Sequence, residues 1–289
     1  SKMINYNPKS WVTLIFAFNR SDTFRMLWKE IIYIGVFTSA LAYVGITYFP
    51  KALFLEKLIN VYSLVGFVIS LLLVFRTNTA YDRWWEGRRK WGELVNDSRN
   101  LAIKLSAVLS DEEDRAYFKR MIPNFVFAAK EHLRKGVLFE QLELTTVEME
   151  LLSNKNHVPM AISELMYKKL IELKKDGKIS EEEFLSFDKN VNAFMDSVGA
   201  CERIKNTPIP FSYSLFIKKF IFIYVTTLPL AFVIQFGYFS ALIATFVFYV
   251  LVSMEVLAEE IEDPFGGDEN DVPTNKLAQN IQRHVAEII

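Results

Sequence analysis

The 289-residue sequence has few of the residues on which catalytic and metal chemistry usually depends. Its one cysteine, Cys201, excludes an intrachain disulfide and a cysteine-based metal cluster. Its three histidines, His132, His157 and His284, have no ligand spacing between them, so we expect them to be ordinary surface or packing residues. No glycine-rich phosphate loop, nucleophile elbow or HExxH motif is present. The sequence therefore does not predict an enzyme.

Net charge is also nearly absent, and long segments have no charge at all. The 33 basic and 34 acidic residues leave a net charge of −1, which gives no reason to expect a nucleic-acid partner. Residues 31–49, 58–75 and 220–254 are uncharged and mostly apolar. Eighteen helical residues rise about 27 Å, close to the hydrocarbon core of a bilayer. The third segment is long enough for two helices that turn near Gly237, so the sequence predicts four transmembrane helices.

The basic residues predict the orientation of these helices. Lysine and arginine precede the first and third helices and follow the second, whereas the opposite loops have few. By the positive-inside tendency, both termini and residues 76–205 are cytoplasmic. We expect residues 3–75 to hold an interfacial helix and the first two transmembrane helices, and 76–205 to form a cytosolic helical bundle. Residues 206–258 hold the other two transmembrane helices, and 259–289 form an acidic C-terminal segment. The fold class is all-α, and no cleavable signal peptide is evident.

One face of the second apolar segment has a regular stripe. Phe67, Leu71 and Phe75 recur at i, i+4 and i+8 and therefore share one side of a helix. If several copies of this helix surrounded an axis, these side chains would form a dry hydrophobic neck. The alternative is that they face lipid or neighbouring helices, as apolar residues of any transmembrane helix do.

Three blocks resemble a known family in their order along the chain. They are LLLVFRTNTAYDRWWEGRRKWGELVNDSRN at 71–100, Pro-Ile-Pro-Phe at 208–211 and Asp-Pro-Phe-Gly at 263–266. These blocks resemble the bestrophin family of ion channels, particularly its bacterial members. The resemblance implies a homopentamer with four transmembrane helices per subunit and one axial pore. It places the pore neck at Phe67, Leu71 and Phe75.

An acidic segment follows the last apolar helix. Eight acidic residues and no basic ones lie between Glu255 and Asp271, and Ca²⁺ takes six to eight oxygen ligands. The spacing is not that of an EF-hand, and a solvated acidic helix end is the alternative. The resemblance implies a Ca²⁺ site like that of animal bestrophins, although Gly267 and Asn270 interrupt its acidic run. Its ligands would be the side chains of Asp268 and Asp271 and the backbone of Glu260 and Asp263.

The family also has a constriction in its cytosolic part, a few residues after a Gly-basic-Ile step. That step is Gly177-Lys178-Ile179 here, and the constriction falls on Glu183 or Phe184. A ring of glutamates would attract cations, and a ring of phenylalanines would be a hydrophobic gate. The alternative is a plain helix N-terminus.

The sequence thus predicts a pore-forming channel for small monovalent ions in a bacterial inner membrane. Its partners are further copies of the chain, the bilayer and the permeating ions, and no cofactor besides possible Ca²⁺ is expected. The absence of basic residues in 58–75 and the glutamates at 181–183 favour cations slightly. Two alternatives remain: a chloride channel, as in animal bestrophins, and a membrane-anchored sensor or scaffold. A transporter is disfavoured because the predicted spans lack ionisable residues before Glu255.

Overall fold

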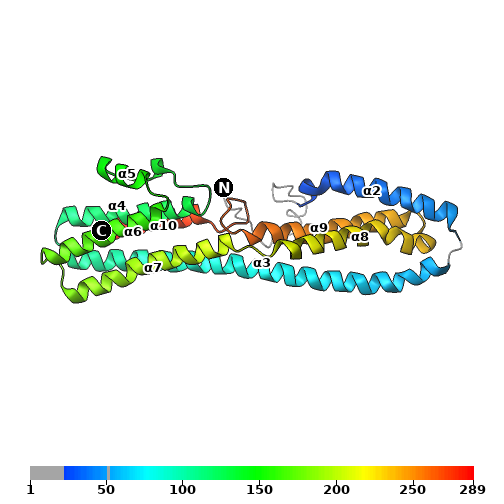
Figure 1. The fold of residues 1–289 in the computed structure, drawn as a ribbon, viewed down its shortest axis with the longest axis horizontal. Helices are drawn as coiled ribbons and strands as arrows, with labels where there is room; N and C mark the ends of the chain where they lie inside the picture. Colours follow the sequence, from blue (N-terminus) through cyan, green and yellow to red (C-terminus); the bar gives the residue numbers. More distant parts are fainter. Residues whose placement is uncertain (1–22, 51–52) are drawn as a thin grey trace. The chain divides into compact units, whose positions relative to one another are not determined.

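The computed structural model describes residues 23–50 and 53–289 (Figure 1). Within these residues every regular element is helical, which confirms the all-α prediction. Most of the expected interfacial helix at 3–29 lies outside the described residues. The elements are α2 (Thr23–Tyr48), α3 (Leu53–Val108), α4 (Glu112–His132), the 3₁₀ helix η1 (Phe139–Gln141), α5 (Thr146–Ser153), α6 (Val158–Lys175), α7 (Glu181–Asn206), α8 (Phe211–Phe236), α9 (Phe239–Glu262) and α10 (Thr274–Ile288).

The chain divides into two compact units. One unit, here called the apolar unit, contains the described residues up to Arg83 together with Pro208–Glu262. The other, here called the polar unit, contains Trp84–Thr207 and Asp263–Ile289. Helix α3 contributes residues to both. The acidic C-terminal segment therefore belongs mostly to the polar unit.

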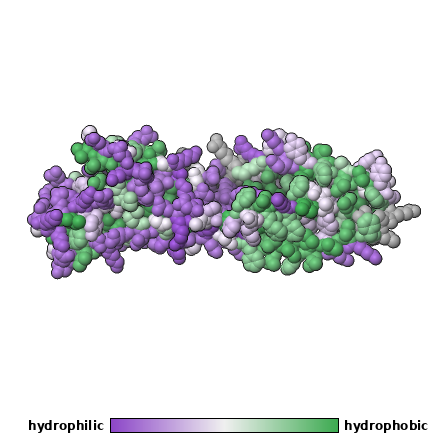
Figure 2. All heavy atoms as spheres, in the orientation of Figure 1, coloured by the Kyte–Doolittle hydropathy of each residue, from purple (hydrophilic) through white to green (hydrophobic). Residues whose placement is uncertain are grey.

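The apolar unit is built from helices that are long and apolar enough to cross a membrane. By length and composition there are four such helices among the described residues: Thr23–Tyr48, Lys57–Val108, Phe211–Phe236 and Phe239–Glu262. Helices α2, α8 and α9 pack against one another, and Figure 2 shows apolar side chains over them. A glycine at position 237, with φ 51°, adopts the left-handed backbone that the turn between α8 and α9 requires.

The polar unit is a bundle with an apolar core of its own. Helices α4, α6, α7 and α10 and the later part of α3 bury large side chains, among them Trp91, Phe118, Phe125 and Phe194. Side chains cap the helix N-termini: Ser180 and Glu183 form a capping box at α7, and Thr145 and Glu148 form another at α5. These caps define where the helices of this unit begin.

Candidate functional site

The apolar part of α3 has a buried face and an exposed face. Ile69 and Leu73 are buried against Ile217, Ile221 and Val225 of α8. Leu71 lies two positions from both Ile69 and Leu73, which at 3.6 residues per turn places it about 160° around the helix from each. Phe67, Leu71 and Phe75 are 66%, 44% and 57% exposed. The three predicted neck residues therefore lie on the side of α3 that the rest of its own chain leaves uncovered.

This helix is the least covered of the four candidate spans. Its most apolar window has 11% of its residues buried, compared with 22% for α2, 44% for α8 and 33% for α9. Within its own chain, the apolar part of α3 is therefore left mostly uncovered.

Polar contacts fix α3 against α8 at its uncharged middle. The Tyr62 hydroxyl donates to Thr227 Oγ1 over 2.6 Å, and the Tyr224 hydroxyl donates to the Tyr62 carbonyl over 3.2 Å. Gly66 permits this approach, because a Cβ at that position would lie 2.6 Å from the Tyr224 oxygen. These contacts orient the opposite face of α3 outward.

A buried cluster of charges fixes the end of the apolar segment of α3. The Arg76 side chain is 1% exposed, and its Nη2 donates to Glu262 Oε2 over 2.6 Å. Its Nε lies 3.6 Å from Glu255 Oε2. Glu262 Oε1 also accepts from the Ile209 backbone N–H, and the Glu262 carbonyl accepts from Arg83 Nε. Arg76 is thus a structural clamp between α3 and α9 and does not face the exposed stripe.

The first ionisable residue along the exposed stripe of α3 is Asp82. It follows Phe75 by seven positions, or about two helical turns, and its side chain is exposed, as is that of Asn78 between them. The exposed face of α3 therefore changes from aromatic and aliphatic to amide and carboxylate side chains. Sequence analysis missed Asp82, although the same periodicity that selected Phe75 could have found it.

The acidic loop after α9 gathers two carboxylates around Gly266. A Cβ at this glycine would lie 3.2 Å from Asp263 Oδ2 and 3.5 Å from Asp271 Oδ2. Asp271 is buried; its Oδ2 accepts from the backbone N–H groups of Gly267 and Asp268, whereas its Oδ1 has no hydrogen-bond partner. Burial raises the pKa of Asp271, and the neighbouring carboxylates add to the shift. A carboxylate oxygen buried without a donor fits a Ca²⁺ ligand. Glu260, the fourth predicted ligand, belongs to α9.

The two candidates for a cytosolic constriction have different surroundings. Glu183 caps α7, because its Oε2 accepts from the Ser180 N–H over 2.7 Å. Phe184 is buried, and its ring packs against Tyr167 with Lys174 Nζ above it. Leu185, which sequence analysis did not select, is 57% exposed. The exposed apolar side chain at the start of α7 is therefore that of Leu185.

The polar unit brings together two histidines that the sequence keeps apart. His132 ends α4 and His157 caps α6, and both Nε2 atoms contact Glu202 Oε1 of α7, at 2.6 and 2.9 Å. The three side chains form a cluster whose possible metal-ligating atoms all lie within 4.8 Å of one another. Among the described residues it is the only such cluster of three or more His, Cys, Asp or Glu. The structure thus brings two of the three histidines to one carboxylate, which the sequence did not predict. No spacing signal could have found them, because they lie 25 positions apart with η1 and α5 between them.

Comparisons with known proteins all point to the same family. The family model described as bacterial/fungal bestrophin protein matches residues 3–287. A voltage-dependent anion channel-forming protein of Nostoc sp. is 33% identical over 228 residues, covering 76% of this chain and 74% of that protein. A protein of the same description from Salmonella typhi is 28% identical over 285 residues, covering 97% and 92%. A crystal structure of a bacterial bestrophin homologue from Klebsiella pneumoniae matches with a TM-score of 0.83 and 26% identity, covering 91% of this chain and 98% of that chain.

Proposed function

Because the chain belongs to the bacterial and fungal bestrophin family, a family of ion channels, we propose that five copies form a channel lined by α3. Phe67, Leu71 and Phe75 of each copy form a hydrophobic neck around a shared axis. Such a neck holds little water and controls conduction through its width and wetting. The channel lies in the bacterial inner membrane, with both termini cytoplasmic as the basic residues predict.

The observation that carries this proposal is the one-sided packing of α3. A transmembrane helix that only anchors a domain does not need an aromatic stripe on the face opposite to the one that packs. Here the packed face holds the polar contacts to α8 and the Arg76 clamp, and the stripe is left for other copies of the chain. Five such stripes facing an axis give the neck, whereas stripes facing lipid would give no conduction.

The sign of the conducted ion depends on the charges beside the neck. The neck itself carries no charge, and Asp82 is the first carboxylate after it on the exposed face. A ring of five such carboxylates attracts cations, which supports the cation preference that the sequence predicts. The relatives named above, which are voltage-dependent anion channel-forming proteins, favour the opposite sign. Anion conduction is therefore the second candidate.

Conduction by purified protein in a planar bilayer under a KCl gradient tests both points. We expect the triple substitution of Phe67, Leu71 and Phe75 by Ala to widen the neck and raise single-channel conductance. We expect Asp82→Asn to move the reversal potential away from the potassium equilibrium value. The matched control is Leu242→Ala, which shortens an exposed apolar side chain of α9 and leaves α3 unchanged. If the triple variant conducts as the wild type does, α3 does not form the neck. A wild-type reversal near the chloride value establishes the anion channel.

We place the cytosolic constriction at the start of α7. Because Phe184 is buried, an apolar ring there would be formed by Leu185, and a polar ring by Glu183. We then expect Leu185→Ala to raise conductance. Phe184→Ala should instead lower the stability of the polar unit, because it removes a buried side chain.

We also propose that the acidic loop binds Ca²⁺. Asp268 and Asp271 would supply carboxylate oxygens, and Asp263, which belongs to the same unit, a backbone oxygen. The partnerless Oδ1 of Asp271 supports this assignment. The bound ion would supply positive charge that offsets the cost of the buried carboxylate.

A further inference from the structure

Three helices of the polar unit bring nitrogen and oxygen atoms that can bind a metal close together. His132 comes from the last turn of α4, His157 from the N-terminus of α6 and Glu202 from α7. The two imidazole rings lie 4.3 Å apart, and both Nε2 atoms point to the same carboxylate oxygen. The three side chains are 23%, 25% and 27% exposed, so a small ion can reach them from solvent.

We propose that His132 Nε2, His157 Nε2 and the Glu202 carboxylate bind a divalent transition metal of the Zn²⁺ class. Two imidazoles and one carboxylate suit Zn²⁺, whose nitrogen and oxygen ligands lie at about 2.0–2.2 Å. Tetrahedral ligands at these lengths are about 3.3 Å apart. The observed contacts of 2.6 and 2.9 Å therefore need to open by less than about 1 Å.

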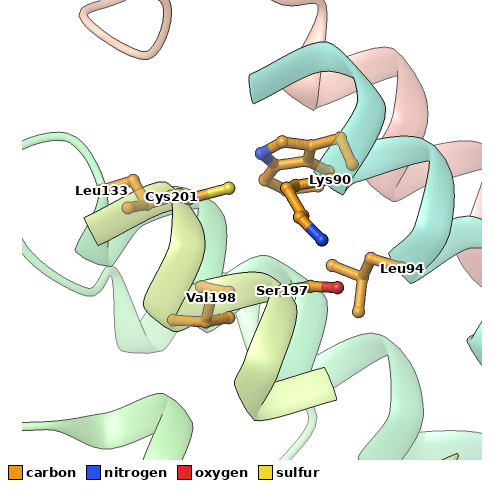
Figure 3. A pocket seen from close by; sticks show the side chains of 8 residues that line it. Lys90, Leu94, Leu133, Ser197, Val198 and Cys201 are labelled. Atoms are coloured by element: carbon orange, nitrogen blue, oxygen red, sulfur yellow. The ribbon is translucent and has the colours of Figure 1, made fainter. Parts of the chain in front are cut away.

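The neighbouring thiol does not complete this site. Cys201 precedes Glu202 and, with Leu133 and Lys90, lines a cavity of about 10 Å³ (Figure 3). Its Sγ is not among the ligand atoms that lie within 4.8 Å of one another in this cluster, which are those of His132, His157 and Glu202. The metal would thus have three protein ligands and a water molecule in its fourth position.

Metal binding at His157 competes with a helix cap. His157 Nδ1 accepts from the Met160 backbone N–H over 3.1 Å, so in the neutral ring the proton is on Nε2. A metal on Nε2 moves that proton to Nδ1, and the cap is lost. The site therefore exchanges the cap of α6 for a metal link between α4, α6 and α7. This exchange makes His157→Asn an informative variant, because Asn caps a helix well and yet lacks the imidazole.

The test is Zn²⁺ titration of the purified full-length protein, dialysed against chelator and freed of any polyhistidine tag. Calorimetry should show one saturable site per subunit, and Co²⁺ should give the visible absorption of a tetrahedral site. We expect His157→Asn or His132→Gln to weaken Zn²⁺ binding at least about tenfold, and the double variant to abolish it. Glu202→Gln should weaken binding as well.

The matched control is His284→Gln, which removes a histidine from α10 and leaves the cluster intact. It should bind Zn²⁺ as the wild type does. Zn²⁺ should also raise the melting temperature of the wild type and the control, and not that of the double variant. Wild-type protein without a saturable site overturns the proposal, as does a site that persists in the double variant. Elution of each variant at the wild-type volume in size-exclusion chromatography shows that it is folded.

Discussion

The buried Arg76 clamp allows a quantitative prediction about the packing of α3. Replacing Arg76 by Ala leaves two carboxylates, Glu255 and Glu262, without their cation at sites where they are 3% and 13% exposed. Removing one partner of a buried ion pair costs about 3–5 kcal/mol, because the remaining charge is buried without compensation. At about 2–4 °C per kcal/mol, the melting temperature should fall by roughly 6–20 °C.

Replacing all three charged side chains by neutral ones should restore most of the stability that Arg76→Ala loses. The variant Arg76→Leu, Glu255→Gln, Glu262→Gln has no unpaired charge, and such replacements are often neutral. The matched control is Lys218→Ala, which breaks the exposed pair with Glu259, worth at most about 1 kcal/mol. The assay is the fraction of protein that keeps its elution volume in detergent after heating. If Arg76→Ala melts no lower than Lys218→Ala, or the neutral triple variant melts no higher than Arg76→Ala, the buried clamp does not stabilise α3.

Two further predictions concern carboxylates of the polar unit. Burial acts to raise the pKa of Asp114, but hydrogen bonds from Lys178 and Lys169, at 2.5 and 2.9 Å, hold it below its usual 3.8. A lowered pKa gives stability that is present above pH 3.8 and is lost as the pH falls through the folded-state value. Thermal unfolding between pH 3 and pH 6 should therefore depend less on pH in Asp114→Asn than in the wild type, and an unchanged dependence would contradict the assignment. At the acidic loop, Ca²⁺ should raise the melting temperature of the wild type but not that of Asp271→Asn, and an equal rise in both would place Ca²⁺ elsewhere.

The fold follows from the sequence wherever one long pattern determines it. The uncharged lengths at 31–49, 58–75 and 220–254 predict the apolar helices, and Gly237 marks the turn in the last of them. The family was also identified from the sequence, since three ordered blocks carry the resemblance, and the family model confirms it. The neck at Phe67, Leu71 and Phe75 stays a prediction, because forming it requires further copies of the chain to face the exposed side of α3.

The rest depended on contacts between distant parts of the chain. Periodicity along α7 does not say whether Phe184 or Leu185 enters the core, since that depends on the packing of Tyr167 from α6. Likewise, no spacing links His132 to His157, because their proximity results from where α4 ends and α6 begins. In the sequence, Arg76 is one of the basic residues that predict the orientation of the helices. Its partners come from α9, and only the packed structure shows its burial.

The separation of Arg76 from those partners has a consequence for biogenesis. Glu262 is synthesised 186 residues after Arg76. At translation rates of about 5–20 residues per second, roughly 10–40 s pass between the two. During that interval the arginine has neither carboxylate of α9 beside it, and it becomes a clamp only when the last apolar helix is made. The clamp should therefore form late, after α9 is synthesised, and chains truncated before α9 should keep Arg76 without its carboxylate partners.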